Sequence, residues 1–196
     1  VFANAAVVVT DEAGLRNALA GDATTIQING TINLTSPLNI ERTVTFVGGT
    51  IVQNRTGSND ATKEQVNALG GTITFKGTKL TVVSGTKAPG ITIGGSTVVV
   101  LDGATLEAEK NDTIYLKNDF TGMLNIIGNS KILAGENNAF NSAFGSAGVV
   151  NFVSGTIENT SGVTIRFQGS SAFNIGGVKG QTATLNLNGT GIQFDN

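Results

Sequence analysis

The sequence contains no cysteine, no histidine and no tryptophan, and it has only one tyrosine and two prolines. Without cysteine and histidine, the usual zinc sites, haem or iron–sulfur ligation and Ser-His or Cys-His nucleophiles are excluded. Twelve basic residues against fourteen acidic ones give a net charge of −2, which provides no basic surface for nucleic acid. No apolar run reaches the length of about 20 residues that spans a membrane. We therefore expect no metal, no cofactor, no nucleic-acid partner and no membrane span.

Glycine and short apolar alternations are what the sequence has in abundance. There are 27 glycines among 196 residues, and 39% of the residues are hydrophobic. The length suits one domain with a real core. One phrase returns along the chain: alternating apolar residues, a glycine, a small polar residue and a second alternation. Its copies are residues 26–34, 44–51, 73–80, 100–106, 126–132, 152–157 and 185–192.

The spacing of the glycines in these phrases predicts the architecture. Gly77, Gly103, Gly128 and Gly155 follow one another at intervals of 26, 25 and 27 residues. Imperfect repeats of this length, built from short strands and turns, are typical of a solenoid. We therefore predict an all-β fold, a right-handed parallel β-helix. The alternative, an antiparallel two-sheet sandwich, would not explain why one phrase recurs in one register.

The pattern also predicts which residues face inward. Ile, Val, Leu and Phe of the alternations should fill the interior, and each glycine should turn a corner with φ > 0. Thr and Asn should form ladders between coils. Six phenylalanines occupy strand positions suited to an interior stack: Phe46, Phe75, Phe152, Phe167, Phe173 and Phe194.

One short helix is predicted over residues 11–20. Asp11 or Thr10 can cap its start, and Leu15, Ala18 and Leu19 lie on one face. A helix of about ten residues needs support for its apolar face. We expect it to close the first coil, because repeat arrays need caps.

Residues 11–49 carry a resemblance to a known family. A short helix precedes a strand, a Gly-Thr-Ile corner at Gly30 and an I-x-x-x-V-T-F-x-G phrase from Ile40 to Gly48. This opening resembles that of pectate-lyase-like right-handed parallel β-helices, and it is most similar to the adhesive-domain branch found on bacterial surface proteins. The resemblance implies a β-helix on a cell surface.

Three further segments complete the organisation. Ala3-Asn4-Ala5 fits the pattern that precedes signal-peptidase cleavage, so residues 1–5 are interpreted as the remnant of an export signal. A secreted or cell-surface location follows. Residues 6–196 are expected to form a single β-helix domain, with loop excursions at 54–70 and at 137–148, the latter carrying Phe140 and Phe144.

Only one stretch is rich in acidic residues. A lyase or glycosidase would need acids in a groove, with a basic residue or a second carboxylate opposite. Lys110 and Lys117 lie within this stretch, but no arginine does. We expect a charged coil surface without catalytic residues. The alternative is a surface Ca²⁺ site built from Glu107, Glu109 and Asp112. The stretch comprises Asp102, Glu107, Glu109, Asp112 and Asp119.

Sugar-binding faces usually present aromatic rings, and Tyr115 is the one candidate here. We expect a non-catalytic surface protein instead, either an adhesin module or a subunit of an extracellular fibre that assembles as a homo-oligomer or filament. The alternative is a polysaccharide-binding or lyase-like protein acting on acidic glycans. Strands near both ends could supply the assembly edges, namely Val7, Val8 and Val9 with Leu185, Leu187, Ile192 and Phe194.

Overall fold

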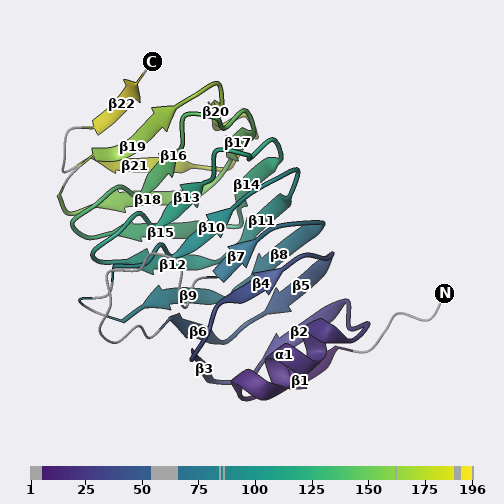
Figure 1. Cartoon of the computed structure of the whole chain (residues 1–196). Coiled ribbons are helices and arrows are strands. Elements are labelled where there is room, and N and C mark those ends of the chain that lie inside the picture. The colour runs from purple at the N-terminus through teal and green to yellow at the C-terminus, as the bar shows by residue number, and fades with distance from the viewer. Residues whose placement is uncertain are drawn as a thin grey trace.

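The protein is a parallel β-solenoid, seen in the computed structural model as a stack of short coils (Figure 1). The structure describes residues 6–53, 66–83, 85, 87–161, 163–187 and 191–195. From β2 onward, successive strands of the chain belong to different sheets, and β2, β5 and β8 are neighbours in one of them. The pairing is parallel, as between β11 and β14 or β15 and β18, and the antiparallel sandwich is therefore wrong.

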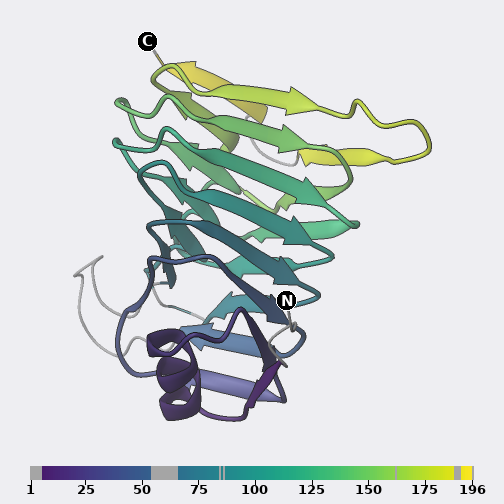
Figure 2. The same cartoon turned by 90° about the vertical axis from the view of Figure 1, so that its right-hand side faces the viewer.

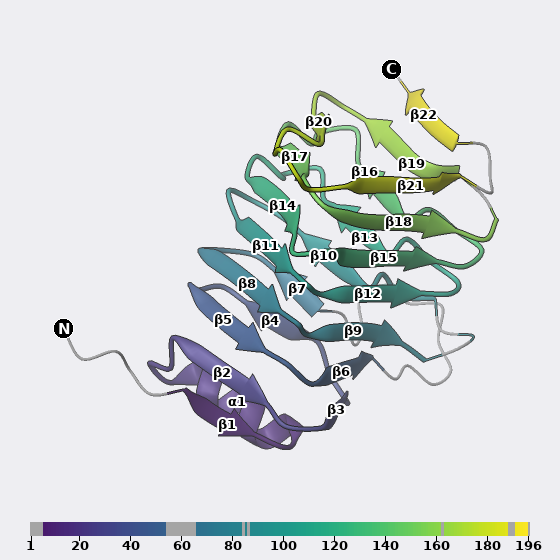
Figure 3. The ribbon, with the colours of Figure 1, turned by 180° about the vertical axis from the view of Figure 1, so that it is seen from behind.

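The described strands form three sheets, which wind around one interior (Figures 2 and 3). Sheet A contains β1 (Val7–Val9), β2 (Thr25–Ile28), β5 (Val44–Val47), β8 (Thr72–Lys76), β11 (Val98–Asp102), β14 (Met123–Ile127), β17 (Val149–Phe152) and β20 (Ala172–Ile175). Sheet B contains β3 (Thr31–Leu34), β6 (Thr50–Gln53), β9 (Lys79–Val82), β12 (Thr105–Ala108), β15 (Ser130–Ala134), β18 (Gly155–Asn159) and β21 (Ala183–Leu187). Sheet C contains β4 (Leu38–Ile40), β7 (Val66–Ala68), β10 (Ile91–Ile93), β13 (Ile114–Leu116), β16 (Phe140–Ser142), β19 (Val163–Gln168) and β22 (Gly191–Asp195).

The predicted helix is present as α1 (Glu12–Ala20), which lies across the first coil (Figure 1). The Asp11 side chain caps it by accepting a hydrogen bond from the backbone N–H of Gly14 at 2.7 Å. Leu15 and Ala18 are buried and belong to the same core cluster as the strands. The helix therefore closes the apolar interior at this end, as expected.

The interior is built from aligned inward side chains of successive coils. In sheet A, Ile26, Phe46 and Phe75 occupy one register position on neighbouring strands, and all three are fully buried. The rings of Phe46 and Phe75 stack with centroids 5.1 Å apart. The row continues through Leu101, Ile126 and Phe152.

The corner between sheets A and B explains the glycine repeat. Gly77, Gly103 and Gly128 have φ values of 61°, 62° and 64°, and Gly155 has a φ of 129°. L-residues rarely adopt such angles, so the repeated glycines are needed at this corner. The prediction that these glycines turn corners with positive φ is confirmed.

Polar ladders run along the outside of the stack. The Asn151 amide donates to Asn125, and the Asn174 amide donates to Asn151, each at 2.9 Å. Asn67 donates to Asn39 at 2.9 Å on sheet C. These bonds link residues of successive coils, as predicted for the outward asparagines.

Two predicted loop excursions need correction. Residues 66–68 form β7, which pairs with β4 and β10 inside sheet C, and residues 54–65 lie outside the described part. Residues 140–142 form β16, which pairs with β13 and β19. Phe140 is fully buried, so its ring holds this segment on the stack, whereas Phe144 is 66% exposed. The polar composition of both segments was misleading because only alternate residues of a strand face inward.

The phenylalanines divide into two groups. Phe46, Phe75, Phe152 and Phe167 lie in the interior as predicted, and Phe173 packs against the core while partly buried. Phe194 is 74% exposed, so its assignment to the interior is wrong. It lies on β22, the terminal strand of sheet C.

The residues interpreted as a signal remnant, 1–5, lie outside the described part.

Candidate functional site

At one end of the stack, β20, β21 and β22 are the terminal strands of the three sheets, and among the described residues no strand pairs with their outer edges. We call this surface the C-terminal end face. Its exposed apolar side chains are Ile175, Ile192 and Phe194, and Leu185 is partly buried there. Leu187, also predicted as an edge residue, is the last residue of β21. Unpaired backbone beside apolar side chains favours the binding of another strand or coil.

An aromatic cluster connects this end face with the interior. Phe167 lies 5.4 Å from Phe140 and 5.4 Å from Phe173, measured between ring centroids. Phe194 stacks on the outer side of Phe167 at 5.8 Å. The exposed ring therefore continues a packed column and is held in a defined position by its neighbour.

One ion pair lies beside this cluster. Arg166 donates through Nε to Asp195 Oδ2 at 2.7 Å, and Gln193 donates to Asp195 Oδ1 at 2.6 Å. These hydrogen bonds, that from Arg166 above all, lower the pKa of Asp195. The carboxylate therefore stays ionised and paired at neutral pH.

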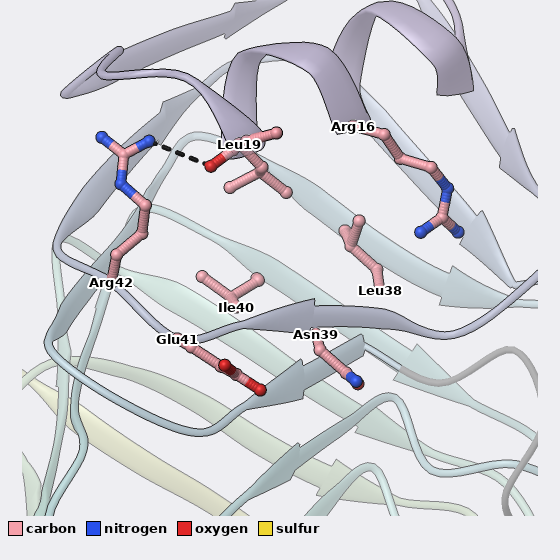
Figure 4. A pocket seen from close by; sticks show the side chains of 8 residues that line it. Arg16, Leu19, Leu38, Asn39, Ile40, Glu41 and Arg42 are labelled. Carbon is pink, nitrogen blue, oxygen red and sulfur yellow. Dashed lines mark hydrogen bonds between the residues drawn. The ribbon is translucent and has the colours of Figure 1, made fainter.

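At the opposite end, β1, β3 and β4 are the terminal strands of the three sheets, and α1 lies beside them. Val7 and Val8 of β1 are exposed, with Val8 at 57%, whereas Val9 is buried. The first two thus fit the predicted edge, and Val9 belongs to the core. The helix α1 lies alongside β4, the terminal strand of sheet C (Figure 4). This end therefore differs in shape from the C-terminal end face.

Two arginines hold α1 in place. Arg42 donates to the carbonyl oxygens of Leu19, Gly21 and Ala23 at 3.2, 2.9 and 2.6 Å. Its charge lies at the helix C-terminus, where the macrodipole favours a cation. Arg16 donates to Glu12 and to the carbonyls of Ser36 and Pro37. The role of these two arginines could not be predicted from the sequence, because no local pattern marks a side chain that donates to a carbonyl about 20 residues away.

Replacing Arg42 with methionine should destabilise the helix cap by about 2 kcal/mol, because several charge-assisted hydrogen bonds are lost while the apolar stem is kept. Urea unfolding measures the difference. Lys76→Met, at an exposed position on β8, is the matched control and should change little. Equal stability of the two variants would contradict this role of Arg42.

A groove of about 400 Å³ lies between α1 and β4, and Figure 4 shows the residues that line it. Arg16 and Arg42 lie on its two sides, but their guanidinium groups donate to carbonyl and carboxylate oxygens of the protein. Leu38 and Ile40 are buried beneath it. The groove is thus the seam between the helix and the first coil.

The acidic stretch does not converge on one point. Glu107 pairs with Lys79 at 2.7 Å and Glu109 with Lys110 at 3.6 Å, and the two acids line one groove of about 500 Å³ on sheet B. Asp119 lies 3.9 Å from Lys117. Among the described residues, no three acidic side chains are placed to hold a metal ion together. The Ca²⁺ alternative thus gains no support from this geometry.

Asp112 is almost fully buried between two coils. Its carboxylate accepts hydrogen bonds from the amide of Asn138 at 2.7 Å and from the amide of Asn141 at 2.8 Å. Burial raises the pKa of Asp112, and the amide donors oppose this without cancelling it. Asp112 therefore holds the coil corner together and lies apart from Glu107 and Glu109.

This raised pKa predicts a pH dependence of stability. Because the folded state disfavours the ionised form, stability should fall as pH rises from the ordinary aspartate range through the higher pKa of folded Asp112. Asp112→Asn lacks this titration. The free energy of unfolding of the native chain minus that of Asp112→Asn should therefore decrease between pH 3 and pH 7 in urea titrations. An increase over that range would contradict the raised pKa.

Tyr115 lies on the outer face of β13, half-buried. Its neighbours in register are Thr92 on β10 and Asn141 on β16. The ring is thus flanked by polar side chains on sheet C. Its role in glycan contact stays a prediction.

Comparison with known proteins does not assign this arrangement to a family. No family model, no curated protein and no solved structure matches the chain. The resemblance of residues 11–49 to the adhesive branch of pectate-lyase-like proteins therefore stays a prediction, whereas the parallel solenoid is shown by the structure. In the described residues, no helix is both long and apolar enough to cross a membrane.

Proposed function

We propose that this chain is a structural or adhesive module of an exported surface protein, and that it associates with copies of itself through the C-terminal end face. The observation that carries the proposal is the apolar end of the stack, where Phe194 continues the interior aromatic column while 74% exposed. Exposed large aromatic groups on a rigid surface are typical of contact sites between proteins.

The rest of the molecule supports a mechanical role. Successive coils are tied together by backbone pairing in three sheets and by the asparagine ladders. These ties between neighbouring coils suit a module that holds its two ends at a fixed separation. The adhesive-branch resemblance of residues 11–49 and the lack of cysteine fit an exported bacterial protein.

Lysines at the end face should abolish self-association. The double variant Ile192→Lys, Phe194→Lys places two charges where apolar contact is proposed, and desolvating them would oppose binding. Light scattering over a range of concentrations should show mass above 20.0 kDa for the native chain and the monomer mass for the variant.

Phe144→Lys provides the matched control. Phe144 is 66% exposed and lies between β16 and β17, two residues after β16 ends. It should associate like the native chain. A native chain that stays monomeric throughout, or a control that dissociates like the double variant, would contradict the proposal. Circular dichroism of each variant establishes that the fold is retained.

A further inference from the structure

We propose that the groove on sheet B is a docking site for a basic peptide segment in the polyproline II conformation. This inference goes beyond the proposed function and does not depend on self-association. The groove has a volume of about 500 Å³ and crosses β9, β12, β15 and β18, which follow one another along the stack (Figure 3). Because β6 and β21 extend sheet B on either side, the groove lies in the middle of the stack.

The charged side chains that line the groove are all acidic. They are Glu107, Glu109 and Glu158, and the described lining residues include no lysine or arginine. Two lysines pair with Glu107 and Glu109 in part-exposed ion pairs, which are weak. Among the described residues, Glu158 forms no ion pair, and it accepts a hydrogen bond from the amide of Asn186 at 3.2 Å. The groove therefore favours a cationic ligand over an acidic glycan.

The floor between the carboxylates is apolar. Leu133 lies in register between Glu107 on one neighbouring strand and Glu158 on the other. Ala108 and Ala134 also line the groove. Lysine and arginine carry apolar stems beneath charged head groups, so these side chains can cover Leu133 while they reach the carboxylates. A basic peptide fits this combination better than an inorganic cation, because the cation has no apolar surface to bury.

The backbone of sheet B limits how a peptide can bind. β12 pairs with β9 and β15, and β15 pairs with β12 and β18. The backbone groups under the groove are therefore not free to pair with an added strand. A polyproline II segment needs no backbone partner, so its side chains alone can make the contact.

The spacing of the carboxylates matches the same conformation. Neighbouring strands lie about 4.8 Å apart, so Glu107 and Glu158, two strands apart, are separated by about 9.6 Å along the stack. Residues three apart in a polyproline II helix lie on one side and are separated by about 9.3 Å. A peptide with a basic residue at every third position can therefore reach both carboxylates across Leu133.

Fluorescence anisotropy of a dye-labelled peptide, Lys-Pro-Pro-Lys-Pro-Pro-Lys, tests the site at physiological ionic strength. The native chain should bind this peptide saturably, and it should not bind a peptide with glutamate in place of each lysine. A peptide with glycine in place of each proline should bind more weakly by about threefold or more, because it has to be ordered on binding. Equal binding of the proline and glycine peptides would overturn the proposed conformation.

Two substitutions in the groove locate the contact. Glu158→Gln keeps the shape of the side chain and removes its charge, so binding should weaken by about threefold. Leu133→Lys places a cation between the two carboxylates and should abolish binding. The matched controls, Glu41→Gln and Thr31→Lys, lie at exposed positions outside the groove and should bind like the native chain. Circular dichroism establishes that each variant keeps the fold.

The outcomes separate the site from its alternatives. A native chain without saturable binding, or equal binding by the native chain, Glu158→Gln and Leu133→Lys, would overturn the site. A glucosamine hexamer that binds more tightly than the peptide, and that Leu133→Lys fails to bind, would overturn the peptide as the occupant. Light scattering of the same samples measures self-association separately, so a failure of the proposed function is distinguishable from a failure of this site.

Discussion

Gly155→Ala is expected to destabilise the protein by about 4 kcal/mol, among the largest effects of a single methyl group anywhere in the stack. Gly155 has a φ of 129°, and a Cβ at this position would lie 2.0 Å from the carbonyl oxygen of Ser130. That oxygen belongs to the backbone of the neighbouring coil and cannot rotate away. The two coils would have to separate, so the pairing of β15 with β18 would be damaged.

Thermal unfolding measures this effect. At about 2–4 °C per kcal/mol for a chain of this size, the melting temperature should fall by about 10 °C. Because solenoid coils contact only their neighbours, limited proteolysis should cut the variant first in the coils around β18.

Gly77→Ala is the matched control for this substitution. Gly77 also lies between a strand of sheet A and a strand of sheet B and has a φ of 61°, but nothing lies within 4 Å of its added Cβ. Only backbone strain of about 1–2 kcal/mol should remain. If both glycine variants lost the same stability, the close approach of Gly155 to Ser130 would not be the cause.

Phe75→Ala should cost about 3–5 kcal/mol, because it leaves a cavity in the middle of the interior row. Phe75 is fully buried, stacks on Phe46 and lies in register with Leu101 of the next coil. Backbone pairing fixes the spacing of the coils, so the neighbours cannot collapse into the space. The free energy of unfolding in urea measures the loss.

The control for the ring deletion is Phe144→Ala. The same side chain is removed there, but it is 66% exposed and contributes little to the core. The change should stay within about 0.5 kcal/mol. A comparable loss at both positions would show that burial within the row does not determine the cost.

The candidate association surface could be predicted only in part. The apolar alternation around Leu185, Ile192 and Phe194 predicts strands there, and the structure places these residues on β21 and β22, the terminal strands of sheets B and C. The sequence could not tell which edge a helix covers. That depends on where α1 packs, which is determined by Arg16 and Arg42 bonding to groups about 20 residues away.

What the sequence by itself determined is the coil. The repeat of glycine corners, the alternation of apolar residues and the Asp11 cap are local signals, and in a solenoid each local unit pairs with the next copy of itself. Only the tertiary structure decided which individual side chains are buried and which are exposed. Asp112 is buried because Asn138 and Asn141 of the next coil bond to it, and Phe140 is buried while Phe144 is exposed. The burial of such a side chain depends on its contacts with residues of the neighbouring coils. A periodic pattern along the chain does not specify those contacts.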